Sequence, residues 1–225
     1  MKTWIIFLFF GTLVACGNTE QQKNVFQDKE TTLKTTSSHT PDFEWENLEK
    51  AYFASGCFWC VEAIYESVFG VRDAVAGYSG GHTKNPTYTS VSTGKTGHAE
   101  SVMVVYDPNK ISFAELVDVY FNSQDVTQQN GQGPDSGSQY RSIIFYQNEE
   151  ERQVIEQKIH ALSQQYKHPI AAEVLAFEKF WKAETYHQDY KKKNPNNPYV
   201  QNVSNPRLQS FKKKSSPELL KENKK

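Results

Sequence analysis

The spacing of hydrophobic residues along the chain alternates between helix-like and strand-like patterns. Between residues 57 and 69, hydrophobic side chains recur at steps of three and four, which predicts a helix that Gly70 ends. Ser112 and Glu115 have the spacing of a capping box ahead of a second helical pattern, and residues 148–165 predict a third helix. Shorter hydrophobic runs predict strands at 50–55, 71–78, 99–106, 142–146 and 171–177.

The order of these elements is strand, helix, strand, strand, helix, strand, followed by a further helix and strand. It predicts an α+β domain in two layers, with a mixed or antiparallel sheet and a ferredoxin-like βαββαβ core. Two long segments rich in Gly, Asn, Ser and Thr, 79–97 and 122–139, separate the predicted elements. Loops of this length in a compact domain usually build a functional site.

The N-terminal residues have the layout of a secretory signal. Lys2 precedes an apolar run, Trp4 to Val14, that is too short to span a bilayer comfortably. The run ends in LVAC, which is similar to a bacterial lipoprotein box in which Cys16 becomes the lipidated first residue. An ordinary cleaved signal and a short buried helix are the alternatives. We expect an exported protein that is anchored to a membrane through Cys16 and faces the periplasm or the cell exterior.

Composition limits the remaining possibilities. With 225 residues, of which 37% are hydrophobic and 13% aromatic, the chain can bury a full core without disulfides. Polar residues dominate 17–47, which we interpret as a flexible tether, and 199–225, which we interpret as a solvated, Lys-rich tail that could be weakly attracted to anionic lipids. The folded domain then spans 48–198. The formal charge of −1 argues against a large basic surface, so we expect no binding of nucleic acid. We also expect the protein to be a monomer.

The stretch SGCFWCVEA, residues 55–63, contains two of the three cysteines. Cys57 follows a predicted strand and lies in the first turn of a predicted helix, where free N–H groups and the helix dipole favour a nucleophilic thiolate. Cys60 follows nearly one turn later, which puts the two Cα atoms about 5 Å apart, within the range of a disulfide. The spacing predicts a redox pair in which Cys57 is the more reactive sulfur.

Other uses of this cysteine pair fit less well. A structural zinc site needs four ligands, and the chain has no second cysteine pair or compact histidine pair, so we expect no metal. A structural disulfide across so short a loop would stabilise little. Thioredoxin-like proteins usually carry a Trp just before the first cysteine, whereas Trp59 lies between the two. We therefore favour redox catalysis on a substrate other than a protein disulfide. A thiol-disulfide oxidoreductase and a non-enzymatic, peptide-binding lipoprotein remain the alternatives.

Six motifs occur in order: GCFWC at 56–60, GYSGG at 77–81, NPTY at 85–88, TGHAESVMVVYDP at 96–108, QGPDSGSQYRS at 132–142 and YHQDYKKKNP at 186–195. Together they resemble the A-type peptide methionine sulfoxide reductases across nearly the whole predicted domain. Enzymes of this kind reverse methionine oxidation, one enzyme for each sulfoxide epimer. The resemblance implies reduction of methionine-S-sulfoxide, free or in proteins, without a metal or an organic cofactor.

The resemblance also implies a role for each matched residue. Cys57 attacks the sulfoxide sulfur and Glu100 supplies the proton; the apolar neighbours of Glu100 would raise its pKa and keep it protonated near neutrality. Tyr88 and Tyr140 resemble the phenols that hydrogen-bond the sulfoxide oxygen, and Asp135 resembles the carboxylate that contacts the substrate backbone. Without the resemblance, Glu100 could equally be a surface carboxylate. The two tyrosines would be interpreted as packing residues, and Asp135 as a loop cap.

Phe58 and Trp59 resemble the aromatic wall that receives the S-methyl group, although in isolation they would be interpreted as core. The sequence departs from the family at Gln124 and Val126, where His and Pro are usual, and at Cys60, where many relatives have Gly and resolve the sulfenic acid with C-terminal cysteines. No cysteine follows Cys60 in this sequence. We therefore expect Cys60 to form a disulfide with Cys57, which a thioredoxin-like dithiol on the same side of the membrane then reduces.

Overall fold

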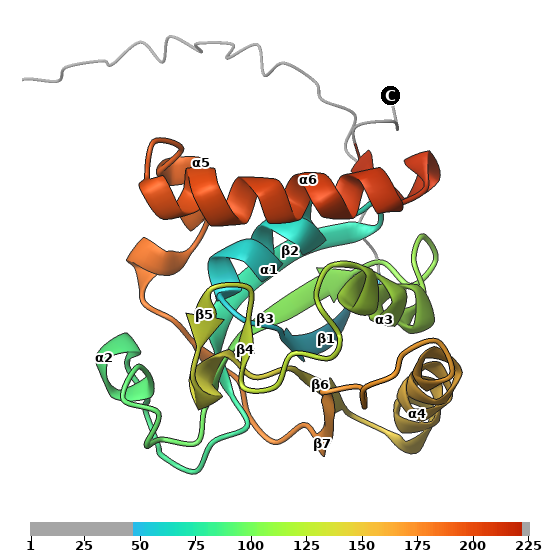
Figure 1. Cartoon of the computed structure of the whole chain (residues 1–225), viewed down its shortest axis with the longest axis horizontal. Coiled ribbons are helices and arrows are strands. Elements are labelled where there is room, and N and C mark those ends of the chain that lie inside the picture. The colour runs from blue at the N-terminus through green and yellow to red at the C-terminus, as the bar shows by residue number, and fades with distance from the viewer. Residues whose placement is uncertain (1–46, 222–225) are drawn as a thin grey trace, which may run out of the picture. The chain divides into compact units, whose positions relative to one another are not determined.

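The computed structural model describes residues 47–221; Cys16, the predicted signal peptide and the predicted tether up to residue 46 lie outside the described residues. At the centre is a six-stranded sheet with the strand order β7-β6-β1-β3-β2-β8 (Figure 1). Its strands are β1 (Glu49–Ala54), β2 (Val71–Ser79), β3 (Ala99–Tyr106), β6 (Ile143–Tyr146), β7 (Glu173–Ala176) and β8 (Trp181–Lys182). Only β7 pairs in parallel, with β6, so the sheet is mixed.

The four strands β6-β1-β3-β2 and two helices form the predicted ferredoxin-like core. Helix α1 (Phe58–Glu66) connects β1 to β2, and α3 (Phe113–Asn122) connects β3 to β6. Both helices pack on the same face of the sheet, where the Tyr65 hydroxyl donates a hydrogen bond to the carbonyl of Leu116, 3.1 Å away. A two-layer α+β domain is therefore confirmed.

Sequence signals mark the boundaries of α3 and α4 (Glu149–Ser163). The predicted capping box is present: Ser112 Oγ accepts from the backbone N–H of Glu115, and the Glu115 carboxylate accepts from the backbone N–H of Ser112 at 2.8 Å. Asn148 is the N-cap of α4, where its Oδ1 accepts from the backbone N–H of Glu151. These caps satisfy backbone donors that would otherwise be free at the helix ends.

The other face of the sheet has a smaller hydrophobic cluster. Tyr52, on β1, stacks on Phe177 with a ring separation of 3.7 Å, and Phe180 and Leu175 pack beside them. Period-two alternation on β3 therefore directs Ala99 to this face and Glu100 to the helix face, beside α1. This alternation is what places a carboxyl group inside the domain.

The two long segments contain short elements. Segment 79–97 contains α2 (Tyr88–Val91), and segment 122–139 contains the hairpin β4 (Gly131–Gln132) and β5 (Asp135–Ser136) with a 3₁₀ turn, η1 (Ser138–Tyr140). The two departures from the family motif are held firmly here. Gln124 accepts hydrogen bonds from Ser142 and Gln132, and Val126 is buried while its carbonyl accepts from Ala171.

The prediction that residues 199–225 form a solvated tail is wrong for the part that the structure describes. Residues Val200–Ser204 form a π-helical turn, η3, which continues into α6 (Asn205–Lys214), and α6 packs against α1 (Figure 1). Leu208 and Phe211 are buried, and Leu220 pairs with Val68. The few apolar residues of this segment recur on one helix face, so an overall polar composition conceals a packed helix.

Two smaller helical elements precede η3: η2 (Thr185–His187) and α5 (Tyr190–Lys193). The last described turn is η4 (Pro217–Leu219). Within residues 47–221, no helix is both long enough and apolar enough to cross a membrane.

Candidate active site

Cys57 lies at the turn that connects β1 to α1. It is the N-cap residue of α1, one position before the first helical turn, and is 6% exposed. Gly56, just before it, has φ of +74°, and a Cβ there would lie 2.5 Å from the Cβ of Gln132. Glycine is therefore required for the chain to turn this sharply and to bring Cys57 beside the β4-β5 hairpin.

Glu100 lies directly beneath this turn and is 3% exposed. Its Oε2 accepts a hydrogen bond of 2.9 Å from the backbone N–H of Phe58, the first residue of α1. The pKa of Glu100 is raised to about 8, first by burial and also by the charges of Asp135 and Cys60, while the hydrogen bond from the Phe58 N–H opposes this shift. At neutral pH the carboxyl group is protonated, as the apolar strand neighbours predicted.

The two thiols are in different surroundings. Burial raises the pKa of Cys57 well above its ordinary value, and contact with Cys60 and the charge of Glu100 add to this effect. The pKa of Cys60 is lowered by its contact with Cys57 first and by the Arg207 guanidinium next, against the burial that raises it. The expectation that the helix N-terminus favours a thiolate at Cys57 therefore does not describe the resting state, because desolvation outweighs the helix dipole.

An aromatic cluster adjoins Cys57. The centre of the Phe58 ring lies 6.4 Å from the centres of the Trp59 and Tyr88 rings. The His187 ring packs against two of these rings, 4.8 Å from Phe58 and 4.5 Å from Tyr88. The indole Nε1 of Trp59 donates to Nδ1 of His187 at 3.1 Å, and Tyr190 stacks on the indole at 3.6 Å. Trp59 is therefore fixed in position, although it is only half-buried.

Tyr140 and Asp135 come from the hairpin region and reach the same cluster. The Tyr140 carbonyl accepts from the backbone N–H of Gly56 at 3.1 Å, which ties η1 to the Cys57 turn. Burial raises the pKa of the Tyr140 phenol, and the charges of Glu100, Tyr88 and Cys57 raise it further, so this hydroxyl remains a hydrogen-bond donor. The structure thus brings together seven of the predicted site residues: Cys57, Phe58, Trp59, Tyr88, Glu100, Asp135 and Tyr140. Cys60 lies in the first turn of α1, three positions after Cys57.

Several residues of the site were missed by the sequence reasoning. Tyr199, within the segment predicted as a tail, donates to Oδ2 of Asp135 at 2.5 Å, and its ring meets that of Trp59 edge-on. Glu184 accepts from the hydroxyl of Tyr78 and from the backbone N–H of Tyr88, both at 2.9 Å, and so holds α2 against the sheet. His187 is fully buried, and the only feature of the sequence that pointed to it is its place in the motif YHQDYKKKNP at 186–195.

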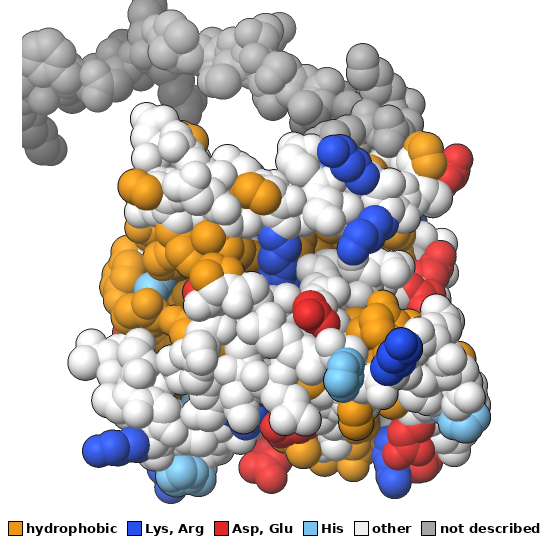
Figure 2. All heavy atoms as spheres, viewed as in Figure 1, with side chains coloured by type: hydrophobic (Ala, Val, Ile, Leu, Met, Phe, Trp, Pro, Cys, Tyr) orange, Lys and Arg blue, Asp and Glu red, His pale blue; other side chains and the backbone are white. Residues whose placement is uncertain are grey.

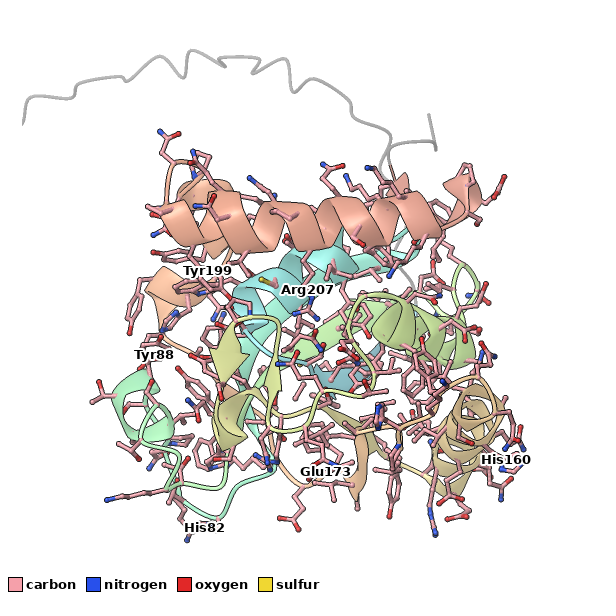
Figure 3. All side chains as sticks on the ribbon, in the orientation of Figure 1. His82, Tyr88, His160, Glu173, Tyr199 and Arg207 are labelled. Carbon is pink, nitrogen blue, oxygen red and sulfur yellow. The ribbon has the colours of Figure 1, made fainter. Side chains whose placement is uncertain are left out.

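Hydrophobic side chains gather on the surface between α2 and α5, on the left of Figure 2. Figure 3 shows Tyr88 and Tyr199 on this side of the molecule, one from α2 and the other from just before η3. Tyr186, here the neighbour of His187, is 58% exposed. In residues 47–221, no group of three or more His, Cys, Asp or Glu side chains is arranged to hold a metal ion.

The arrangement combines four chemical functions. A thiol can act as a nucleophile, a protonated carboxyl group beside it can donate a proton, and phenols can hydrogen-bond a polar oxygen. The aromatic rings can receive a methyl or thioether group through apolar and sulfur–aromatic contacts. A small substrate with both an electrophilic centre that bears oxygen and an apolar substituent would match this set.

Comparisons with known proteins agree with this chemistry. A family model described as "Peptide methionine sulfoxide reductase" matches residues 49–220. The chain is 46% identical over 163 residues to Peptide methionine sulfoxide reductase MsrA 1 of Rhodopirellula baltica, covering 72% of this chain and 85% of the relative. It is 45% identical over 166 residues to the MsrA of Pasteurella multocida, covering 74% and 95%.

Two solved structures are also similar. Methionine sulfoxide reductase A of Corynebacterium diphtheriae has a TM-score of 0.60 and 36% identity, covering 67% of this chain and 76% of that one. Mxr1 of Saccharomyces cerevisiae in reduced form has a TM-score of 0.61 and 32% identity, covering 66% and 87%. The sequence and structure comparisons agree on one family.

Proposed function

The chain belongs to the peptide methionine sulfoxide reductase family, and we propose that it reduces methionine-S-sulfoxide, free or within oxidised proteins, through Cys57. The family activity makes it an oxidoreductase. The observation that carries the assignment of residues is the protonated, buried Glu100 beside Cys57 at the start of α1. No surface carboxylate or structural thiol would need this arrangement.

In the first step, Cys57 attacks the sulfur of the sulfoxide while the S-methyl group of the substrate lies against Phe58 and Trp59. The oxygen passes to Cys57, so that methionine sulfur is reduced and Cys57 is oxidised to a sulfenic acid. Glu100 gives its proton to the oxygen and regains one from the Cys57 thiol. Because both groups are protonated at rest, the step builds up little net charge in a buried site.

Tyr88 and Tyr140 hold the sulfoxide oxygen in this scheme, and Asp135 holds the substrate backbone. The raised pKa of each phenol supports a donor role, since the hydroxyl keeps its hydrogen at physiological pH. The hydrogen bond from Tyr199 leaves the second oxygen of Asp135 for a substrate N–H.

In the second step, Cys60 condenses with the sulfenic acid and forms the Cys57–Cys60 disulfide. The backbone N–H of Cys60 donates to the carbonyl of Cys57 at 3.0 Å, so the two cysteines share one turn at the start of α1, and this supports their pairing. A thioredoxin-like dithiol then reduces the disulfide and restores both thiols. This recycling partner must work outside the cytoplasm if the chain is exported as a lipoprotein through Cys16, which we also propose.

Substitution of each cysteine separates the two steps. Cys57→Ser should produce no methionine from the S epimer. Cys60→Ser should release about one methionine per enzyme and then stop with a thioredoxin-type reductant, leaving a sulfenic acid on Cys57 that a specific reagent labels. Continued thioredoxin-driven turnover by Cys60→Ser would overturn the resolving role of Cys60.

The same preparation tests the two alternatives. A thiol-disulfide oxidoreductase would reduce insulin disulfides without any sulfoxide, and a passive peptide-binding protein would keep its function in Cys57→Ser. We expect the parent to turn over methionine-S-sulfoxide with dithiothreitol, and not the R epimer. Equal turnover of both epimers would contradict the proposed specificity.

A further inference from the structure

Cys60 lies in a polar pocket inside the domain. It is 1% exposed, and its Sγ lies 3.1 Å from Ser204 Oγ and 3.9 Å from the hydroxyl of Tyr199. A small residue that only fills space on the buried face of a helix would be expected among apolar neighbours. Here the sulfur faces groups that can donate hydrogen bonds to it.

Ser204 is placed for this contact by the π-helical turn η3. Its side chain is 1% exposed, and the Cys60 sulfur is the hydrogen-bond partner that the structure gives to its hydroxyl. Single π-helical turns inside or beside α-helices are rare and often occur at functional sites. In this chain the turn directs a hydroxyl toward a helix that lies 144 positions earlier in the sequence.

Arg207, one turn further along α6, brings a fixed positive charge to the same place (Figure 3). Its guanidinium donates to the carbonyl of Ser55 at 2.9 Å, to the Ser55 hydroxyl at 2.7 Å and to the carbonyl of Ser123 at 2.9 Å. All three acceptors are neutral oxygens, so these bonds do not neutralise the charge of the guanidinium. That charge lowers the pKa of Cys60.

We propose that Ser204 is a positioning residue for the second step: its hydroxyl donates to the Cys60 sulfur and holds it as a thiolate next to Cys57. The inference rests on the proposed function. In that step, the Cys60 thiolate attacks the Cys57 sulfur, the Cys57 sulfur–oxygen bond breaks, and a sulfur–sulfur bond forms. The departing hydroxide takes up one proton and leaves as water, while Cys60 is oxidised and the sulfenic sulfur is reduced.

Several other groups act on Cys60 and must be identical in the two proteins that a test of Ser204 compares. They are Cys57 at the N-cap of α1, Glu100 on β3, Tyr199 before η3 and Arg207 on α6. Only Ser204 can be changed by removing a single oxygen atom, in Ser204→Ala, without losing a bond to a third residue. Ser210→Ala, at an exposed position of α6, is the matched control.

The first measurement titrates Cys60 directly and needs no sulfoxide. In the full chain with Cys16→Ser and Cys57→Ser, Cys60 is the only thiol, and its thiolate absorbance reports its ionisation. Ser204→Ala should move the midpoint to higher pH by about one unit, since a hydrogen bond to a charged group is worth about a tenfold change or more in the equilibrium. Ser210→Ala should leave the midpoint unchanged, and a midpoint equally unmoved by Ser204→Ala would overturn the proposal.

The second measurement follows one turnover without reductant in the Cys16→Ser chain. Ser204→Ala should release its first methionine at the parent rate, while closure of the disulfide slows about tenfold at neutral pH and recovers as the pH rises. Disulfide closure at the parent rate across the pH range would overturn the proposal. Absence of methionine from the parent would overturn the proposed function instead, and the titration would still decide whether Ser204 holds the Cys60 thiolate.

Discussion

At the scale of single residues, Glu100 shows how a strand and a helix together create an acid. Alternation on β3 turns its side chain inward, and the first N–H of α1 fixes its carboxyl group beside Cys57. A carboxylate that accepted this hydrogen bond in water would have a lowered pKa. Here burial is the larger effect, so the carboxyl group holds a proton that it can transfer.

Replacement of this acid tests its role. Glu100→Gln keeps an oxygen that can accept from Phe58 but removes the transferable proton, so the first-turnover rate at neutral pH should fall about 10²- to 10⁴-fold. Rapid-quench measurement of methionine release gives this rate. Asp73→Asn, at an exposed position of β2, is the control and should react like the parent. A Glu100→Gln rate within about twofold of the parent would remove Glu100 from the acid role.

The pH dependence of the same step follows from the pKa of Glu100 of about 8. The acid must be protonated, so the first-turnover rate should be constant below that pH and fall as the pH rises through it, by about tenfold per unit. Because folding raises the pKa of Glu100, its carboxyl group keeps its proton at neutral pH and loses it only as the pH rises through about 8. A rate that rises through pH 8 would instead indicate that ionisation of Cys57 limits the step.

At the scale of elements, the C-terminal helix completes the site although its sequence resembles a tail. Phe211 is 1% exposed and packs with Leu208 in the main core, beside α1. The same segment supplies Tyr199 to Asp135 and Ser204 to Cys60. The segment that makes these two site contacts must be held at a fixed distance from α1, and its buried residues provide that fixation.

Removal of the Phe211 ring should therefore destabilise the whole domain. Phe211→Ala should lower the free energy of unfolding by about 3 to 5 kcal/mol, the usual cost of deleting a buried aromatic ring. Urea denaturation followed by tryptophan fluorescence measures the change. Lys213→Ala, at an exposed position two residues away, should stay within about 0.5 kcal/mol of the parent. A loss below about 1 kcal/mol for Phe211→Ala would mean that α6 is not part of the cooperative unit.

These elements also show what could be predicted from the sequence. Short hydrophobic runs located β1, β2 and β3, and the Ser112–Glu115 capping box located α3, because these signals are local and strong. The inward direction of Glu100 follows from alternation only once the helix face of β3 is known. The contact of Tyr199 with Asp135 joins residues 64 positions apart and depends on a helix hidden among lysines and asparagines. No local pattern encodes such a contact.

At the scale of the whole molecule, the catalytic residues and the proposed anchor are well separated in the sequence. The site draws on residues from Ser55 to Arg207, and Cys16 precedes all of them. Segment 17–47 is mostly polar, as expected of a tether between a lipid and a domain. In this proposed organisation, the chain needs its first residues for location and not for chemistry.

Substitution of the proposed lipid-bearing residue separates location from activity. Cys16→Ser should shift the protein from the membrane fraction to a soluble or unprocessed form, because several acyl chains are needed for stable attachment and none could be added. Its turnover of methionine-S-sulfoxide in extracts should equal that of the parent, since Cys57, Cys60 and Glu100 are unchanged. Thr19→Ala, a substitution in the polar segment, is the control and should stay membrane-bound and processed. A Cys16→Ser protein that is processed and still sediments with membranes would show that lipid is not attached at this residue.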